Sequence, residues 1–364
     1  MNSTYNAATI MGNQTAGQVE YDFNCMAVVF CSTNFTTECE NVTLNACPAC
    51  NMRYAAIFIT LLLILGFMIV AGNVIIIIST RFLKRQSKVD VIRTSLAGAD
   101  ILTGLNIFTV VVYHFVKTLN WTAAELVQYQ ASVVNTAPAV IGAVVFVFTV
   151  TSSLYHLLLL SCERLYAIQW PISYKLQSRS SLHRVLIGVW IVSAVTASVP
   201  GWFPKRFVFN YFPSLFVYYP YINLVDARKN IDSVIVLMGI FIVLPFVLTM
   251  LILTTTMCIG HLQFKKSKRL ANHARASNMK KELSMIVHLS TMKLGFSATV
   301  IPIVALSIAY FTLRKSCAEI VAPTAACFYL SMGNSLVNVV VYSLFDKDFR
   351  KCVKSNLRLR CRLC

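Results

Sequence analysis

Residues 139–171, AVIGAVVFVFTVTSSLYHLLLLSCERLYAIQWP, join a long apolar run to an acid and a base that stand side by side. The run is long enough to cross a bilayer, which takes roughly 20 consecutive, mostly apolar residues in a helix. It ends at Glu163 and Arg164, and side chains of neighbouring helical residues do not face each other. The pair therefore either serves a partner beyond the helix or marks the membrane–water interface, where a long Arg side chain reaches lipid phosphates.

The composition of the whole chain is that of a membrane protein. Of its 364 residues 57% are hydrophobic and 13% charged, with a mean hydropathy of +0.67, whereas soluble domains carry about a quarter charged residues. Lipid makes each spanning segment satisfy its own backbone, so segments of this length are helices. The sequence predicts an all-α membrane protein, a seven-transmembrane helix bundle, with spans at about 54–80, 92–116, 138–162, 185–204, 231–260, 283–311 and 320–344.

Basic residues are unevenly distributed around these segments. Positions 1–52 hold no Lys or Arg, whereas five lie in residues 80–93, seven in 261–281 and seven from Lys347 onward. Because cytoplasmic loops carry the excess of Lys and Arg, we expect the N-terminus outside the cell and the C-terminus inside. The net charge of +18 then reflects this topology and contact with acidic membrane lipids, and no nucleic-acid partner is expected.

This orientation divides the chain into three parts. We expect a plasma-membrane protein with an extracellular tail, a helix bundle and a cytoplasmic end, over residues 1–53, 54–344 and 345–364. Residues 1–50 lack the charged and apolar regions of a secretory signal peptide, so the first spanning segment is expected to act as the signal anchor.

The predicted outer tail has the features of an extracellular surface. N-x-[ST] glycosylation sequons fall on the predicted outer side throughout, at Asn2, Asn13, Asn34, Asn41 and Asn120. An odd number of cysteines in the tail predicts a disulfide framework with one thiol left over, from Cys25, Cys31, Cys39, Cys47 and Cys50. The remaining thiol either bridges to Cys317, with Cys327 a deeper candidate, or stays free.

Polar residues recur inside the apolar segments. Asp100 lies in the middle of the second segment, and an ionisable group at membrane depth is a functional hypothesis by default. Asn73, Ser153, Asn334 and Asn338 bring neutral oxygens on other segments, so packing would gather the oxygen ligands that suit Na⁺. An interhelical hydrogen-bond network around a neutral Asp would use the same residues, and both interpretations stay open.

A series of residues falls in order on the successive segments: Asn73, LAGAD around Asp100, Glu163-Arg164-Leu165, Trp190, Pro200, Pro245, Phe296 with Pro302, and NVVVY at 338–342. Together they resemble the helix-by-helix signature of the rhodopsin-like (class A) G-protein-coupled receptors, over about residues 55–355. The resemblance implies a cell-surface receptor without enzymatic activity, with an extracellular ligand and a heterotrimeric G protein as partners. Homo- or hetero-oligomers stay open.

The resemblance also implies roles for individual residues. Glu163 would neutralise Arg164 at rest, and activation would free Arg164 for the G protein; the switch set is Glu163, Arg164, Leu165, Asn338 and Tyr342. Asp100, Ser153, Asn334 and Asn338 would form an allosteric Na⁺ site, and no other cofactor is implied. After Tyr342, SLFDKDFRKCV resembles a short amphipathic eighth helix on membrane lipid, followed by the palmitoylation candidates Cys352, Cys361 and Cys364.

The positions that the resemblance assigns to a ligand pocket are almost wholly apolar. Phe146 stands where amine receptors carry an Asp, and Met332 where light-sensing relatives carry the retinal lysine, so neither ligand is expected. A lipid-like or other apolar molecule suits the wall, made of Phe146, Val147, Val150, Leu237, Phe241, Ile303, Val304, Ser307, Phe328 and Met332. A peptide or protein at the aromatic segment 207–221, or no ligand in this pocket, are the alternatives.

Several positions depart from the family pattern. Val300 and Leu253 replace a usual Trp and Tyr, and Val339 replaces the proline that helps to kink the seventh helix. Ala139 replaces a cysteine, and residues 201–230 hold none, so the usual bridge to the second outer loop cannot form. A non-signalling decoy or scaffold therefore stays open. A transporter or channel is less favoured, because the sequence shows no interrupted helix pairs or inverted repeats.

Overall fold

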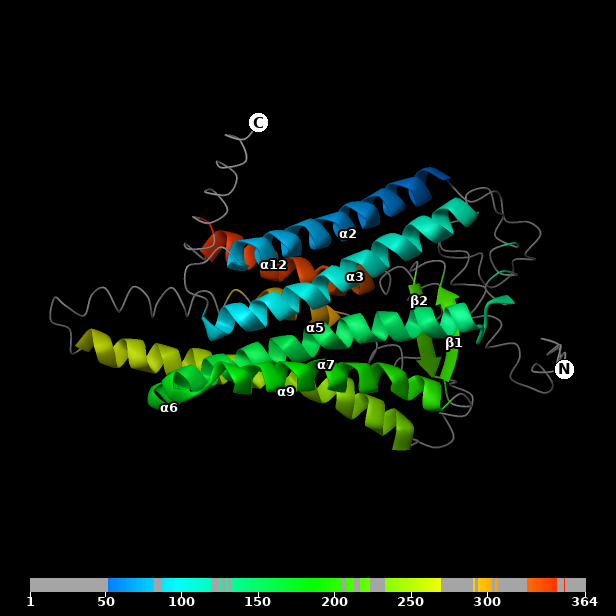
Figure 1. Ribbon diagram of the computed structural model, residues 1–364. Coiled ribbons are helices and arrows are strands. Elements are labelled where there is room, and N and C mark those ends of the chain that lie inside the picture. Colours follow the sequence, from blue (N-terminus) through cyan, green and yellow to red (C-terminus); the bar gives the residue numbers. More distant parts are fainter. Residues whose placement is uncertain are drawn as a thin grey trace.

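Long helices lie side by side in the computed structural model (Figure 1). The structure describes residues 52–81, 87–118, 125, 129, 132–203, 207–212, 217–222, 233–269, 291, 294–302, 305–306, 326–345 and 350. The helices are α2 (Met52–Arg81), α3 (Lys88–Thr118), α5 (Ala137–Gln169), α6 (Pro171–Leu176), α7 (Arg179–Trp202), α9 (Ser233–Arg269) and α12 (Asn334–Phe345). Strands β1 (Phe207–Phe212) and β2 (Val217–Ile222) pair as an antiparallel hairpin. The hairpin and α6 lie at opposite ends of the bundle, which we call the hairpin end and the α6 end (Figure 1).

The predicted membrane helices are present wherever the structure describes the chain. Among the described residues five helices are long and apolar enough to cross a membrane, and a bent pair, Ala326–Met332 with Asn334–Leu344, makes a sixth when it is counted as one span. The segment predicted at 283–311 is described only in part, as helix over 294–302. The all-α membrane fold predicted from the sequence is confirmed.

Other predictions lie outside the described residues. These are the tail with its sequons and cysteines, Asn120, Cys317, and the eighth helix with Cys352, Cys361 and Cys364. Cys327, the deeper candidate for a bridge, forms no disulfide within the part of the chain that the structure describes.

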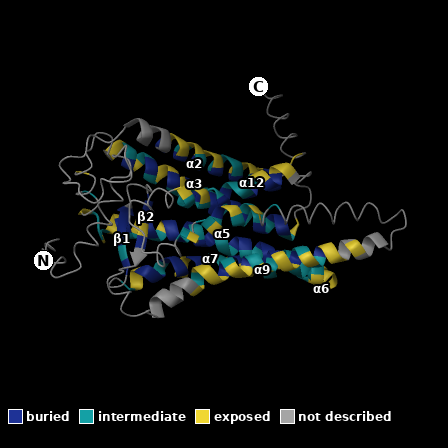
Figure 2. Cartoon of the chain, turned by 180° about the vertical axis from the view of Figure 1, so that it is seen from behind, coloured by how far each residue is buried: buried dark blue, intermediate teal, exposed yellow. Residues whose placement is uncertain are grey.

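Helix α5 lies at the centre of the bundle. It packs against α3, α7, α9 and both strands, and buried residues recur along it, whereas exposed residues follow much of α9 (Figure 2). Large apolar side chains such as Phe67 on α2 and Leu251 on α9 are exposed. Their exposure is expected where the solvent is lipid, because hydrocarbon chains are as apolar as these side chains.

The last span bends by 46° although Val339 stands where the family has a proline. The bend lies at Gly333, whose carbonyl accepts hydrogen bonds from the backbone N–H groups of both Leu336 (2.9 Å) and Val337 (3.3 Å). Glycine lets the backbone leave regular helix at low steric cost, so the bend has a cause other than proline. Val339 instead packs against α2, where a Cβ on Gly72 would lie 2.7 Å from its Cγ1.

The hairpin is held without the disulfide that the sequence lacks. Its strands bury Phe207, Phe209, Tyr211 and Tyr218 in one cluster with Ala139, Ala143 and Val199 of α5 and α7. The His114 ring on α3 stacks on Tyr211, with ring centroids 3.5 Å apart, and its Nε2 lies 3.0 Å from the Tyr218 hydroxyl. We call His114, Tyr211 and Tyr218 the histidine clasp.

A second attachment lies just before α5. The Asn135 backbone N–H donates to the Phe209 carbonyl (2.8 Å), and the Phe209 N–H donates to Asn135 Oδ1 (2.9 Å). Asn135 has φ 54°, a left-handed conformation that Asn tolerates better than most residues. The aromatic segment predicted as a peptide or protein surface is therefore a strand pair tied to α3 and α5, a structure that the sequence analysis did not predict.

We expect Gly142→Ala to loosen this hairpin. A Cβ at Gly142 would lie 2.5 Å from Cδ2 and 2.7 Å from Cγ of Tyr218, so the ring must move away at a cost of about 1–3 kcal/mol. The midpoint of thermal unfolding should fall by several degrees, and hydrogen exchange in β1 and β2 should accelerate. The control is Gly188→Ala on α7, where a Cβ meets nothing within 4 Å. Equal stability of the two variants would contradict the clasp.

Candidate functional site

A fully buried carboxylate lies at the centre of the bundle. Asp100 Oδ1 accepts hydrogen bonds from the hydroxyls of Ser153 (2.6 Å) and Ser335 (2.8 Å), and Oδ2 accepts one from Asn338 Nδ2 (3.1 Å). These donors come from α5 and α12, so one side chain of α3 connects three helices. These three hydrogen bonds compensate for the hydration that the carboxylate loses on burial.

Asn73 extends this network to α2. Its Nδ2 donates to the backbone carbonyls of Ile69 (2.9 Å) and Ser335 (3.4 Å), and its Oδ1 is buried with no hydrogen-bond partner among the described residues. The sequence analysis placed Asn334 in the same group. Its Oδ1 instead accepts a hydrogen bond from the Thr299 hydroxyl (3.4 Å). We call Asn73, Asp100, Ser153, Ser335 and Asn338 the central polar cluster.

Glu163 lies buried at the α6 end, with α6 as its main partner. The Tyr174 hydroxyl donates a hydrogen bond to Glu163 Oε1, whereas Arg164 Nε lies 3.9 Å from Glu163 Oε2. Burial and the bond to Glu163 raise the pKa of Tyr174. The neighbouring Glu163 and Arg164 are therefore only in long-range contact, and the hydrogen bond to the Glu163 carboxylate comes from Tyr174. Leu165, next along α5, is half-buried.

Lys88 links the start of α3 to the same tyrosine. Its Nζ donates to the Tyr174 carbonyl and lies 4.4 Å from the centroid of the Tyr174 ring. Helix α3 begins there with a capping box: the Ser87 N–H donates to Asp90 Oδ2 (2.8 Å), and the Asp90 N–H donates to Ser87 Oγ (3.2 Å). The capping box fixes the position from which α3 presents its charged residues.

Arg93 covers Tyr342, the tyrosine of NVVVY. The Arg93 guanidinium lies 4.4 Å from the centroid of the buried Tyr342 ring, and Asp90 Oδ1 lies 3.5 Å from Arg93 Nη1. A cation over an aromatic face is attracted by the ring quadrupole. We call Lys88, Asp90, Arg93, Glu163, Arg164, Tyr174 and Tyr342 the α6-end cluster.

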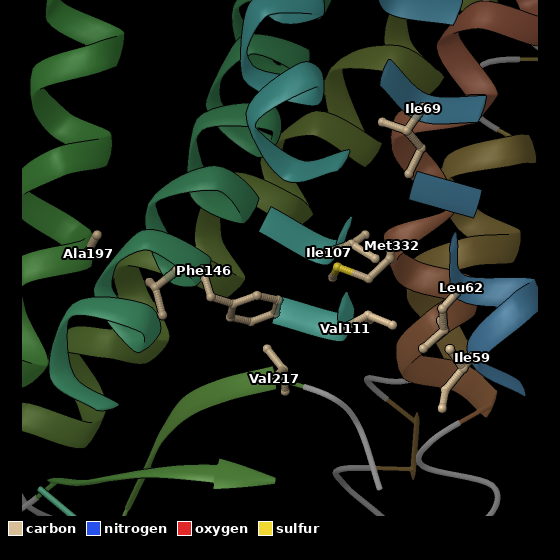
Figure 3. Close-up of a cluster of buried hydrophobic side chains, with 10 residues drawn as sticks. Ile59, Leu62, Ile69, Ile107, Val111, Phe146, Ala197, Val217 and Met332 are labelled. Atoms are coloured by element: carbon tan, nitrogen blue, oxygen red, sulfur yellow. The ribbon is translucent and has the colours of Figure 1, made fainter. Parts of the chain in front are cut away.

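The third group lies near the hairpin end. Phe146 and Met332 are buried together with Val217 of β2 (Figure 3). Val147 is buried with them, and Val150 and Phe328 pack against this group. The rings of Phe146 and Phe328 stack with centroids 5.5 Å apart. We call these six residues the hairpin-end apolar cluster.

Only part of the predicted pocket wall is in this cluster. Phe241 on α9 is half-buried and is not among its described members; its backbone carbonyl accepts a hydrogen bond from the Tyr155 hydroxyl (2.8 Å). The side chain of Leu237, and residues Ile303, Val304 and Ser307, lie outside the described residues.

The sequence analysis missed several residues of these sites. Ser335 stands three residues before Asn338, one turn of the same helix, and this spacing could have identified it. His114 is an ionisable residue inside an apolar segment, which is a signal in itself. Arg93 and Tyr174 lie in stretches that sequence alone assigns to a basic loop, and no local pattern marks their partners.

The fold and these clusters define a helical membrane protein with a polar centre, one charged end and one apolar, hairpin-covered end. The sequence pattern described as "7 transmembrane receptor (rhodopsin family)" matches residues 70–342. The chain belongs to this receptor family.

Two relatives are octopamine receptors by name. The chain is 23% identical over 335 residues to "Octopamine receptor beta-1R" of Drosophila melanogaster, a match that covers 81% of this chain and 61% of the relative. It is also 23% identical over 346 residues to "Octopamine receptor beta-2R" of Chilo suppressalis, covering 83% and 79%. The chain thus spans about three fifths of the first of these relatives.

We expect Ser335→Ala to destabilise the bundle. The change removes one of the two hydroxyls on Asp100 Oδ1, and interhelical hydrogen bonds in membranes contribute about 0.6–1.7 kcal/mol. The unfolding temperature of the purified protein should fall by a few degrees. Ser343→Ala, at an exposed position on the same helix, should leave it unchanged; equal effects would show that the bond to Asp100 contributes nothing.

Proposed function

We propose that the protein is a cell-surface receptor that converts the binding of an extracellular ligand into nucleotide exchange on a heterotrimeric G protein. The observation that supports this most is the α6-end cluster, in which Glu163 and Tyr174 lie beside Arg164 and a second guanidinium covers Tyr342. Such contacts hold α6 against α5 and α12 against α3. A partner that needs Arg164 and Tyr342 elsewhere must break them, which is how a two-state switch operates.

The orientation follows from charge. Arg81, Lys88, Arg93, Arg179 and Lys265 lie at or near helix ends on the α6 side of the bundle, and cytoplasmic segments carry the excess of Lys and Arg. We therefore assign the α6 end to the cytoplasm, where the G protein binds, and the hairpin end to the outside of the plasma membrane.

The ligand that fits best is apolar in its main part. Phe146, Val147, Phe328 and Met332 offer aromatic and aliphatic surface, and no carboxylate stands at position 146 for an ammonium group. The names of the two relatives concern an amine, but at 23% identity we do not carry that ligand over to this chain. A peptide on the hairpin is the second candidate, favoured by the exposed ring of Tyr219.

The decisive measurement is basal G-protein activation in cells without added ligand, for the wild type and Arg164→Ala at matched surface expression. We expect activation of at least one G-protein class by the wild type and its loss in Arg164→Ala, because the guanidinium would contact the partner. If the wild type activates no class of G protein, with or without apolar ligands, the result would favour the non-signalling decoy.

Arg93→Leu is the companion variant, with the opposite expected sign. It removes the cation from the Tyr342 ring and keeps only a shorter apolar side chain at position 93, so Tyr342 is freed and basal activation should rise. A cation–π contact contributes about 0.5–2 kcal/mol, which corresponds to a rise of about two- to thirtyfold in the active fraction while that fraction stays small. A fall in basal activation would contradict the restraint.

We also propose that Na⁺ binds the central polar cluster. The residues present fit this ion: a buried carboxylate, the hydroxyls of Ser153 and Ser335, and Asn73 Oδ1, a buried acceptor without a donor among the described residues. These are oxygen ligands, which suit a hard cation. A bound Na⁺ would supply positive charge beside Asp100, and Asp100, Ser153 and Ser335 would then keep α3, α5 and α12 in the resting arrangement.

Replacing choline chloride with NaCl at equal ionic strength should therefore raise the unfolding temperature of the purified wild type. A ligand at a hundred times its Kd stabilises by about 2.7 kcal/mol, so a shift of several degrees is expected at saturation. Asp100→Asn should lose this response, and KCl should reproduce little of it. An equal response of the wild type and Asp100→Asn would remove the ion from this site and leave a hydrogen-bond network.

A further inference from the structure

The register of the hairpin gives it two different faces. Residues paired across antiparallel strands point to the same side, and successive residues alternate. Tyr211 pairs with Tyr218, and both belong to the histidine clasp on one face. Asn210 pairs with Tyr219, so these two residues share the opposite face.

This opposite face is directed at the hairpin-end apolar cluster. The Tyr219 ring lies edge to face with Phe146, their centroids 5.8 Å apart. Val217, two residues earlier on the same face, is buried with Phe146 and Met332, and Figure 3 shows it pointing toward the Phe146 ring. Among the described side chains of this face, the surface toward the helices is therefore aromatic and aliphatic, apart from Asn210 and the hydroxyl of Tyr219.

Asn210 is fully buried, with 0% of its surface exposed. The Tyr211 backbone N–H donates to Asn210 Oδ1 at 2.8 Å, and this bond fixes which end of the amide is the oxygen. Asn210 Nδ2 then carries two N–H groups that have no acceptor among the described residues. Buried donors are nearly always paired in native proteins, so this one indicates a missing acceptor.

We infer that Asn210 is the specificity-determining polar contact of the ligand site, and that its amide donates to an acceptor oxygen on an otherwise apolar ligand. The inference rests on the proposed receptor function and names its ligand class: an aromatic or aliphatic body with a carboxylate or carbonyl oxygen at one end. A protonated amine is excluded from this contact, because an ammonium group is only a donor and cannot pair with Asn210 Nδ2.

Entry of such a ligand requires part of the hairpin to yield. Tyr219 packs on Phe146 yet is 40% exposed, so its ring can leave toward solvent while the histidine clasp and Asn135 hold the other face of the hairpin. The apolar body then takes the place of the Tyr219 ring between β2 and Phe146, and its oxygen lies on the Asn210 side.

The test uses two small probes with the same body and opposite head groups, 4-phenylbutyrate and 4-phenylbutylamine. Binding to the purified full-length receptor in nanodiscs is measured by saturation-transfer NMR and by the shift in unfolding temperature. We expect the wild type to bind the carboxylate about tenfold more tightly than the amine, which corresponds to one charge-assisted hydrogen bond. Equal binding of the two probes, or binding of neither, would overturn the inference.

Two variants at Asn210 decide whether the preference comes from this residue. Asn210→Leu keeps the side-chain size but removes the donors, and the preference should disappear. Asn210→Asp turns the donor into an anionic acceptor, and the preference should reverse toward the amine. Asn106→Leu on α3 is the matched control and should bind as the wild type does.

A carboxylate preference that survives in Asn210→Leu would place the probe elsewhere and refute the assignment. The assay contains no G protein, so its result is independent of the Arg164→Ala experiment. If the wild type activates no G protein but still shows the Asn210-dependent preference, G-protein activation is refuted and the ligand site stands. If the wild type activates a G protein but shows no Asn210-dependent preference, the proposed ligand class is refuted and the receptor function stands.

Discussion

The buried carboxylate of Asp100 is the constraint on which the arrangement of the helices depends. A charge or an unpaired oxygen at membrane depth costs several kcal/mol, since neither lipid nor water can satisfy it there. Asp100 is tolerated because Ser153, Ser335 and Asn338 reach it from two other helices. Any displacement of α12 relative to α3 must break at least one of these bonds, so the position of α12 is linked to the centre of the bundle.

Helix α5 connects Asp100 to both the hairpin end and the α6 end of the bundle. Phe146, Ser153 and Leu160 follow one another at intervals of seven residues, about two turns, and so share one face. That face contacts the apolar cluster beneath the hairpin, then Asp100, and reaches Glu163 and Arg164 one turn beyond Leu160. Helix α5 therefore connects the apolar cluster beneath the hairpin, Asp100 and the α6-end cluster, so a shift of this one helix would act on all three.

How much could be predicted from the sequence depends on the range of each interaction. The helices followed from apolar length, and Asp100, Ser153 and Asn338 from the cost of polar groups in lipid. The histidine clasp could not be predicted, because His114 and Tyr218 are 104 residues apart and only the folded hairpin brings them together. The contact between the Arg93 guanidinium and the Tyr342 ring could not be predicted either. A basic residue near a helix end is ordinarily explained by the membrane orientation of the chain, not by a specific partner.

In the proposed switch, the two arginines of the α6-end cluster would determine how firmly the resting state is held. Arg93 and Arg164 lie close enough to repel each other, while Asp90, Glu163 and the Tyr342 ring attract them. The Glu163–Arg164 contact is long at 3.9 Å, so the attraction that remains is modest and partly cancelled by the repulsion. We infer that the resting state is favoured by a small margin. In the proposed receptor, with Val300 and Leu253 in place of the usual aromatic residues, this small difference in free energy would let a partner shift the equilibrium toward release of Arg164 from Glu163.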